Sequence, residues 1–193
     1  AAIVHISTDY VFPGTVARAW LPTDPVSPLN VYGQTKLAGE EAVRSEAPRH
    51  LIVRTSWVYS HEGRNFVRTM LRLSDEGREL RVVNDQHGSP TAAADLAAAL
   101  LIAGASVRAR PALAGTHHFS NAGLVTWFEF ATAIFEIRGG DSPRLTPIST
   151  SDYPAPARRP AWSALDTTSF RQVFGVSPRP WREALCDTMR RLM

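Results

Sequence analysis

Short apolar runs alternate with helical segments over the first hundred residues of the sequence, and this alternation limits the fold more than any other feature. Residues 3–6 and 51–53 are apolar and mostly β-branched, which is typical of strands buried in a sheet. A helix is predicted between them at 31–46, ended before Pro48. Strands that alternate with helices in this way predict an α/β fold with a mostly parallel sheet.

The same reading of apolar spacing extends to the rest of the chain. It predicts strands at 80–83 and 116–120, and helices at 65–76, 91–103, 126–138, 167–174 and 181–192. Proline-rich or polar stretches mark loops at 13–30, 84–90 and 151–160.

Small polar residues follow both of the N-terminal strands. Ser7-Thr8-Asp9 comes after the first strand, and Thr55-Ser56-Trp57 comes after the second. In parallel α/β sheets the ligand lies beyond the carboxyl ends of the strands. We therefore expect these two segments to line the same crevice.

Tyr32 and Lys36 lie four residues apart on the predicted helix, so their side chains share one face. Lysine occurs once in the chain, against twenty arginines. A free tyrosine has a pKa of about 10, and a neighbouring ammonium lowers the pKa of a phenol. The pair therefore predicts a proton donor for a carbonyl oxygen, although ordinary surface contacts share this spacing.

The hydroxyl of Thr8, at the end of a strand, has two interpretations. It can hydrogen-bond a substrate carbonyl and polarise it. It can also cap the turn that follows, which is a common role of threonine. Thr8, Tyr32 and Lys36 in this order form a more specific pattern than any one of them, and the pattern favours catalysis.

Composition argues against several other classes of protein. The chain has 193 residues, of which 44% are hydrophobic and 20% charged, as in ordinary globular domains. Its net charge of +3 comes from scattered arginines, so we predict no nucleic-acid partner. No apolar run approaches the ~20 residues that span a bilayer, and we find no signal peptide, so we predict no membrane partner. The one cysteine, Cys186, allows no intrachain disulfide and favours the cytoplasm.

Several blocks of the sequence are similar to the dTDP-4-dehydrorhamnose reductase family of the extended short-chain dehydrogenases. The similarity is carried by residues 7–12, 27–40, 54–59, 65–71 and 84–91, and it continues through Tyr153-Pro154 and Arg159-Pro160 to the last helix. It therefore covers essentially the whole chain.

This resemblance implies the C-terminal part of a Rossmann-type, doubly wound parallel sheet with a small α/β substrate-binding lobe. Residues 1–60 would be the remainder of the NAD(P)-binding domain and carry the catalytic residues. Residues 61–193 would form mainly the lobe, with 80–104 returning to the sheet.

The resemblance also implies a reaction, the reduction of the 4-keto group of dTDP-4-dehydro-L-rhamnose, a dTDP-4-keto-6-deoxy sugar, with NADPH or NADH. Tyr32 would protonate the oxyanion, Lys36 would assist it and hold the nicotinamide ribose, and Thr8 would polarise the ketone. The implied cofactor-binding residues are Ser7, Tyr32, Lys36 and Thr55, and the implied substrate-binding residues are Thr8, Asp9, Trp57 and Arg159. For Trp57 and Arg159 the alternatives are simple packing and an exposed charge.

Two positions depart from related patterns. Dehydratases of this class place Asp-Glu after the threonine, whereas Tyr10 follows Asp9 here, which favours reduction over elimination. Trp162 stands where many relatives have asparagine. The resemblance allows a homodimer, and some relatives bind magnesium at such a contact. The matching stretch, Ala94-Asp95, has few acids, and we predict no metal site.

No Gly-x-x-Gly-x-x-Gly pattern, which lets a backbone approach a pyrophosphate, occurs in the chain. The sequence starts almost directly in a strand and without methionine. We therefore expect the first third of the family domain to be absent and the first strand to be an exposed edge. We also expect this chain alone to bind NADPH weakly or not at all.

Two other functions stay open. A non-catalytic relative, such as the regulatory subunit of methionine adenosyltransferase, resembles the same family, but loss of Tyr32 or Lys36 would be its signature and both are present. A 4-ketoreductase for another dTDP-sugar would share all of these residues, because selectivity among sugars depends on the shape of the pocket.

Overall fold

Three parallel strands form the main sheet of the protein in the computed structural model, which describes residues 2–140, 143–153 and 155–192. Pro154 of the matched blocks lies outside these ranges. The strand order is β1 (Ile3–Thr8), β2 (His50–Thr55) and β7 (Gly115–His118). Both pairings are parallel, which confirms the predicted sheet.

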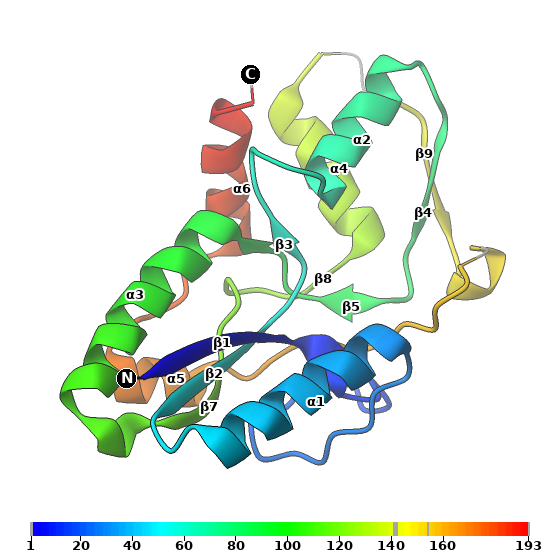
Figure 1. Ribbon diagram of the computed structural model, residues 1–193. Coiled ribbons are helices and arrows are strands. Elements are labelled where there is room, and N and C mark those ends of the chain that lie inside the picture. Colours follow the sequence, from blue (N-terminus) through cyan, green and yellow to red (C-terminus); the bar gives the residue numbers. More distant parts are fainter. Residues whose placement is uncertain (1, 141–142, 154, 193) are drawn as a thin grey trace.

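Helices cover both faces of this sheet, as in a doubly wound fold (Figure 1). Helix α1 (Val31–Glu46) lies on one face, while α3 (Ala93–Ala109) and α5 (Thr168–Phe174) lie on the other. Leu51 and Val53 of β2 pack into the cluster that α3 and α5 complete. Arg54, one position further along β2, bonds to α1 instead. Successive side chains of β2 therefore point to opposite faces of the sheet.

Helix α1 begins and ends where the sequence predicts. The side chain of Asn30 caps it by accepting a hydrogen bond from the Gly33 N–H at 2.9 Å. The helix stops at Glu46. Ala47 leaves the helical conformation because it precedes Pro48, and the residue before a proline is disfavoured in the α region.

The molecule has two layers, the main sheet with its covering helices and a lobe. The lobe is built mostly from helices and has a separate core. Its helices are α2 (Phe66–Asp75), α4 (Trp127–Arg138) and α6 (Trp181–Arg190), beside the parallel strands β4 (Leu80–Val83) and β9 (Leu145–Ile148). Two short pairs join the layers: β3 (Val58–Tyr59) with β6 (Thr91–Ala92), and β5 (His87–Gly88) with β8 (Val125–Thr126). Single 3₁₀ turns occur at Asp9–Val11, Pro111–Leu113 and Thr150–Asp152. Phe130, Ile134 and Leu185 are fully buried in the lobe core.

Two expectations need correction. The first strand is not buried: Ile3, Val4 and Ile6 are each more than two-fifths exposed, because β1 pairs only with β2 among the described residues. The exposed edge itself was expected and is confirmed. The segment 80–104 does not return to the main sheet as a whole. Its strand β4 pairs with β9 in the lobe, and its helical part, the beginning of α3, packs on the main sheet.

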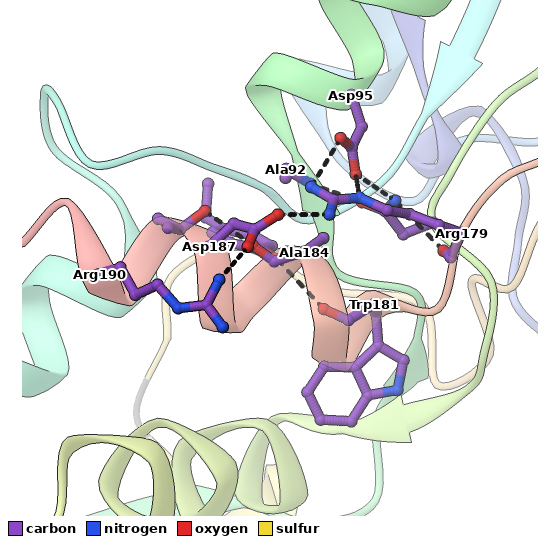
Figure 2. Close-up of polar contacts among 10 residues, drawn as sticks. Ala92, Asp95, Arg179, Trp181, Ala184, Asp187 and Arg190 are labelled. Atoms are coloured by element: carbon purple, nitrogen blue, oxygen red, sulfur yellow. Dashed lines mark hydrogen bonds and ion pairs between the residues drawn. The ribbon is translucent and has the colours of Figure 1, made fainter.

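Arg179 ties the two layers together (Figure 2). Its Nε and Nη2 donate to Asp95 of α3 at 2.8 and 2.9 Å, and its Nη1 donates to Asp187 of α6 at 2.5 Å. Asn121 adds a further bond to Asp95 and also accepts from the Ala92 N–H. A helix over the sheet and a helix of the lobe therefore share one cation.

None of the described helices combines the length and apolarity required to cross a bilayer. Across the same residues, His, Cys, Asp and Glu nowhere gather in threes suited to a metal ion.

Candidate active site

One cleft of about 450 Å³ opens at the carboxyl ends of β1 and β2. The sheet register pairs Thr8 with Thr55, which places the two strand ends at the same level. The start of α1 and the start of α4 complete its walls. This central cleft is lined by seven of the eight predicted residues: Ser7, Thr8, Asp9, Tyr32, Lys36, Thr55 and Trp57. The crevice expected from the two polar segments is therefore present.

Thr8 caps the turn that follows it. Its hydroxyl accepts from the Tyr10 N–H at 3.2 Å and donates to Asp9 Oδ1 at 2.9 Å. The turn-capping alternative therefore describes the geometry of Thr8. The residue still lines the cleft, and its proton becomes available to a ligand once it leaves Asp9.

Asp9 is the one acidic residue among the described residues that line the cleft. It is 2% exposed, and burial raises the pKa of its carboxyl group to about 7, with the Ser163 and Thr8 hydroxyls opposing the rise. Its second oxygen, Oδ2, is buried and has no hydrogen-bond partner among the described residues. Burial therefore brings the titration of Asp9 close to neutral pH.

Tyr32 and Lys36 project from the first turns of α1. The Lys36 Nζ donates to the Ile6 carbonyl at 2.5 Å, which anchors the ammonium over the end of β1. Tyr32 is 55% exposed, and its ring meets that of Tyr10 edge to face at 6.0 Å. Gly33 lets α1 pack closely against the backbone of Tyr10, because a Cβ at position 33 would lie 2.3 Å from the Tyr10 carbonyl oxygen.

Two hydroxyls of the cleft, those of Ser7 and Thr55, are buried, with Ser7 only 3% and Thr55 only 5% exposed. Thr55 Oγ1 has no partner among the described residues, while Ser7 Oγ makes no close hydrogen bond but lies near enough to the Glu40 carboxyl to help lower its pKa. Buried polar atoms are normally paired, so such atoms at a cleft fit a polar ligand. Lys36 uses one of its three donors on Ile6 and can offer the others beside them.

Trp57 forms the wall of the cleft that faces the lobe. Its indole stacks on that of Trp127 with centroids 3.5 Å apart and planes 7° from parallel. Its backbone has a φ of +48°, and it is the one non-glycine with positive φ in the described ranges. Trp57 therefore packs against the lobe, as one of the two interpretations predicts, and its ring also lines the cleft.

Arg159 lies outside the central cleft. It is exposed and lines a neighbouring hollow of about 350 Å³, which we call the aromatic hollow. Phe66, Tyr153 and Trp127 are among the walls of this hollow, and Trp127 also lines the cleft. The Arg159 guanidinium opposes a rise in the pKa of Tyr10 that burial causes, so its charge acts close to the cleft.

A buried ion pair lies beneath the cleft, between α1 and the sheet. Arg54 donates through Nε and Nη2 to the two oxygens of Glu40, at 2.9 and 2.8 Å. Burial disfavours the charged carboxyl, yet the Arg54 guanidinium holds the pKa of Glu40 below its usual range. His118 is also buried there; its Nδ1 lies 3.0 Å from the Trp20 carbonyl, and burial lowers its pKa to about 3. A neutral His118 donates through Nδ1 and leaves Nε2 facing Arg54.

Tyr10 and Trp127 also line the cleft, although neither was predicted there. Tyr10 adjoins the matched Thr8-Asp9 pair, so its place in the cleft was within reach. Trp127 lies seventy residues from Trp57, and no local signal links them. The Glu40–Arg54 pair also joins two elements, although both residues fall inside matched blocks.

The arrangement suits proton transfer to a polar substrate. A phenol and an ammonium on one helix face the ends of two strands that carry hydroxyls and a carboxyl group. A carbonyl oxygen near the Tyr32 hydroxyl could take its proton, since tyrosine is an established general acid. Charge that develops on that oxygen would be stabilised by Lys36 and by hydroxyl donors.

Comparison with known proteins finds relatives over the whole chain. The family model described as the RmlD substrate binding domain matches residues 1–193. The dTDP-4-dehydrorhamnose reductase of Escherichia coli K12 is 46% identical over 187 residues, which cover 94% of this chain and 62% of that protein. The chain thus spans less than two-thirds of the length of this curated relative.

Solved structures give the same result. A dTDP-4-dehydrorhamnose reductase from Clostridium acetobutylicum has a TM-score of 0.90 and 40% identity, covering 98% of this chain and 65% of that one. The reductase of Bacillus anthracis, solved in complex with NADP, has a TM-score of 0.86 and 39% identity, covering 97% of this chain and 64% of that one.

Proposed function

Because the chain belongs to the RmlD substrate-binding domain family, we propose that it carries the proton-transfer and substrate-binding part of a dTDP-4-dehydrorhamnose reductase. The reaction is reduction of the 4-keto group of dTDP-4-dehydro-L-rhamnose to dTDP-L-rhamnose. The observation that supports it best is the meeting of Thr8, Tyr32 and Lys36 in one cleft. The proposal also includes a location in the cytoplasm. It further assigns residues 1–60 to the NAD(P)-binding domain and residues 61–193 mainly to the substrate-binding lobe.

Tyr32 is the proton donor in this proposal. Its exposed hydroxyl gives a proton to the ketone oxygen as that oxygen becomes an alkoxide. Lys36, fixed on the Ile6 carbonyl, stabilises the resulting phenolate through its charge. Thr8 polarises the ketone once its proton turns from Asp9 to the substrate.

The reduced nicotinamide of NADPH or NADH supplies the hydride when it is bound. The hydroxyls of Ser7 and Thr55, together with the remaining donors of Lys36, fit the ribose and carboxamide groups of that cofactor. Tyr32 would also border it. A glycine-rich turn for its pyrophosphate does not occur in this sequence.

The sugar would occupy the part of the cleft between Asp9 and Trp57. The Asp9 carboxyl group can bind a sugar hydroxyl, and the Trp57 indole gives the ring an apolar surface. The aromatic hollow would hold the base of the nucleotide, with Arg159 beside it to bind phosphate oxygens.

The test measures NADPH oxidation by the protein that contains this chain, with a panel of dTDP-4-keto sugars. Tyr32→Phe should lower kcat by roughly 100-fold or more, since a general acid contributes about that much. Tyr59→Phe is the matched control, because that hydroxyl lies outside the cleft and bonds to the Trp181 carbonyl. Unchanged turnover in Tyr32→Phe would refute the assignment, and preference for another sugar would replace the substrate.

A further inference from the structure

We propose that Trp127 is a positioning residue that fixes the indole of Trp57, and that this stacked pair selects the sugar that enters the central cleft. The sugar-selecting part rests on the proposed function. The positioning part concerns the two side chains alone and can be tested without a ligand.

The backbone of Trp57 indicates that its position is imposed by its surroundings. A φ of +48° is unfavourable for a bulky residue and persists only where neighbours enforce it. The Trp57 carbonyl accepts from the Thr91 N–H at 3.2 Å, which holds the backbone on one side. The side chain therefore needs its own support to make this conformation stable.

Trp127 gives that support, together with Gly88. The Trp127 ring lies face to face with Trp57 at 3.5 Å. A Cβ at position 88 would lie 2.4 Å from Trp57 Cε2, so only glycine leaves room for the indole there. Ring and backbone together leave Trp57 little freedom.

Trp127 is itself held rigidly by the lobe. It is the first residue of α4, after a capping box in which Thr126 Oγ1 accepts from the Glu129 N–H and Glu129 Oε2 accepts from the Thr126 N–H. Its ring packs on Phe66 at 4.6 Å and lies 6.4 Å from Phe130 of the lobe core. The lobe therefore holds Trp127 in place, and Trp127 in turn holds the Trp57 indole at the wall of the cleft.

The location of Trp127 makes this support relevant to selectivity. It lines both the central cleft and the aromatic hollow, so it separates the two spaces. The indole pair gives the cleft an apolar wall, which suits the methyl group of a 6-deoxy sugar. A hydroxymethyl group against the same wall would lose water without gaining a partner.

The experiment compares Trp127→Ala and Trp127→Phe with Trp181→Ala in the protein that contains this chain. Trp181 is a close match, because it also starts a helix and packs on Phe130, at 5.7 Å, yet it does not line the cleft. Fluorine NMR of the protein labelled with 5-fluorotryptophan, with the Trp57 resonance assigned by Trp57→Phe, reports whether the Trp57 indole keeps one position. Calorimetric titration with dTDP-L-rhamnose and dTDP-L-mannose, two sugars that differ only at C6, reports selectivity.

We expect the wild type to show one sharp Trp57 resonance and to prefer dTDP-L-rhamnose by about tenfold, the discrimination typical of one small group in a pocket. Trp127→Ala should broaden or split the Trp57 resonance and lose the preference, Trp127→Phe should keep part of the preference, and Trp181→Ala should keep both the sharp resonance and the preference. A single sharp Trp57 resonance in Trp127→Ala overturns the positioning role. A preserved preference with a broadened Trp57 resonance overturns the selecting role. A wild type that binds neither ligand refutes the proposed function together with the selecting role, while the Trp57 resonance still decides the positioning role.

Discussion

The buried carboxyl group of Asp9 makes the stability of the protein depend on pH. Burial raises its pKa to about 7, so the folded state holds a proton that the unfolded state releases near its ordinary value. Between these two pKa values the folded state binds more protons, and the free energy of unfolding therefore falls as pH rises. The stabilising contribution is complete at acid pH and lost as pH passes through about 7.

Asp9→Asn should remove this dependence. Relative to the wild type, the variant should gain stability on going from pH 4 to pH 8, on the order of 4 kcal/mol if the whole shift is realised. Denaturant unfolding at several pH values measures the difference. His118, whose lowered pKa gives an opposite slope below its ordinary value, is present in both proteins and cancels. Parallel curves for the two proteins would contradict the raised pKa of Asp9.

The residues of the cleft differ in how far the sequence predicted them. Tyr32 and Lys36 share one helix, and helical periodicity alone places them together. Thr8 and Thr55 require only that parallel strands end at one edge of a sheet. Arg159 lies in a proline-rich loop whose path depends on tertiary contacts, such as the bond from Asn30 Nδ2 to the Arg158 carbonyl. Its position relative to the cleft could not follow from spacing.

At the scale of elements, α1 is fastened to the sheet by a stripe of side chains at every fourth position. Lys36 bonds to β1 through the Ile6 carbonyl, and Glu40 bonds to β2 through Arg54. Arg44 reaches β7 through Thr116 Oγ1 at 3.4 Å and also bonds to Glu40. The Glu40–Arg54 pair is almost fully buried, so it fixes the height of the helix over the sheet.

Glu40→Gln should weaken this attachment strongly. The variant leaves the Arg54 cation buried without its counter-charge, a change that typically costs about 3–5 kcal/mol. Denaturant unfolding measures the loss. Lys36 is the only lysine, so the rate at which its amine is acylated, located by peptide mapping, shows whether the start of α1 loosens as well.

Glu41→Gln is the control for this prediction, since it makes the same change at the next, exposed position of the helix. It should alter neither stability nor acylation of Lys36. Equal effects of the two substitutions would show that the buried pair does not position α1.

Local signals predicted helices better than strand partners. The limits of α1 were found from its cap and a proline, both of which lie in the sequence beside it. Helix α3 runs to Ala109, six residues past the predicted end, because its apolar face continues to Val107 in the core. The pairing of β4 with β9 joins segments some sixty residues apart, and no feature of residues 80–83 distinguishes that partner from the main sheet.

At the scale of the whole molecule, the cleft lies between a sheet with an exposed edge and a lobe. In the proposed function the residues of the cleft bind the nicotinamide end of the cofactor, but the sequence contains no glycine-rich turn for its pyrophosphate. The 193-residue chain alone should therefore bind NADPH weakly or not at all. Fluorescence titration of the chain measures this directly, and tight binding would show that the pyrophosphate is held by other groups.

The relative position of sheet and lobe depends on the Arg179 network shown in Figure 2. Asp95→Asn weakens three hydrogen bonds, two from Arg179 and one from Asn121, and we expect a loss of about 1–2 kcal/mol because these bonds are only partly exposed. The thermal midpoint should fall by a few degrees in a chain of this size. Glu136→Gln breaks the exposed Glu136–Arg182 pair within the lobe and should leave the midpoint unchanged. If the two variants melt alike, Arg179 does not hold the layers together, and the short strand pairs between them must do so.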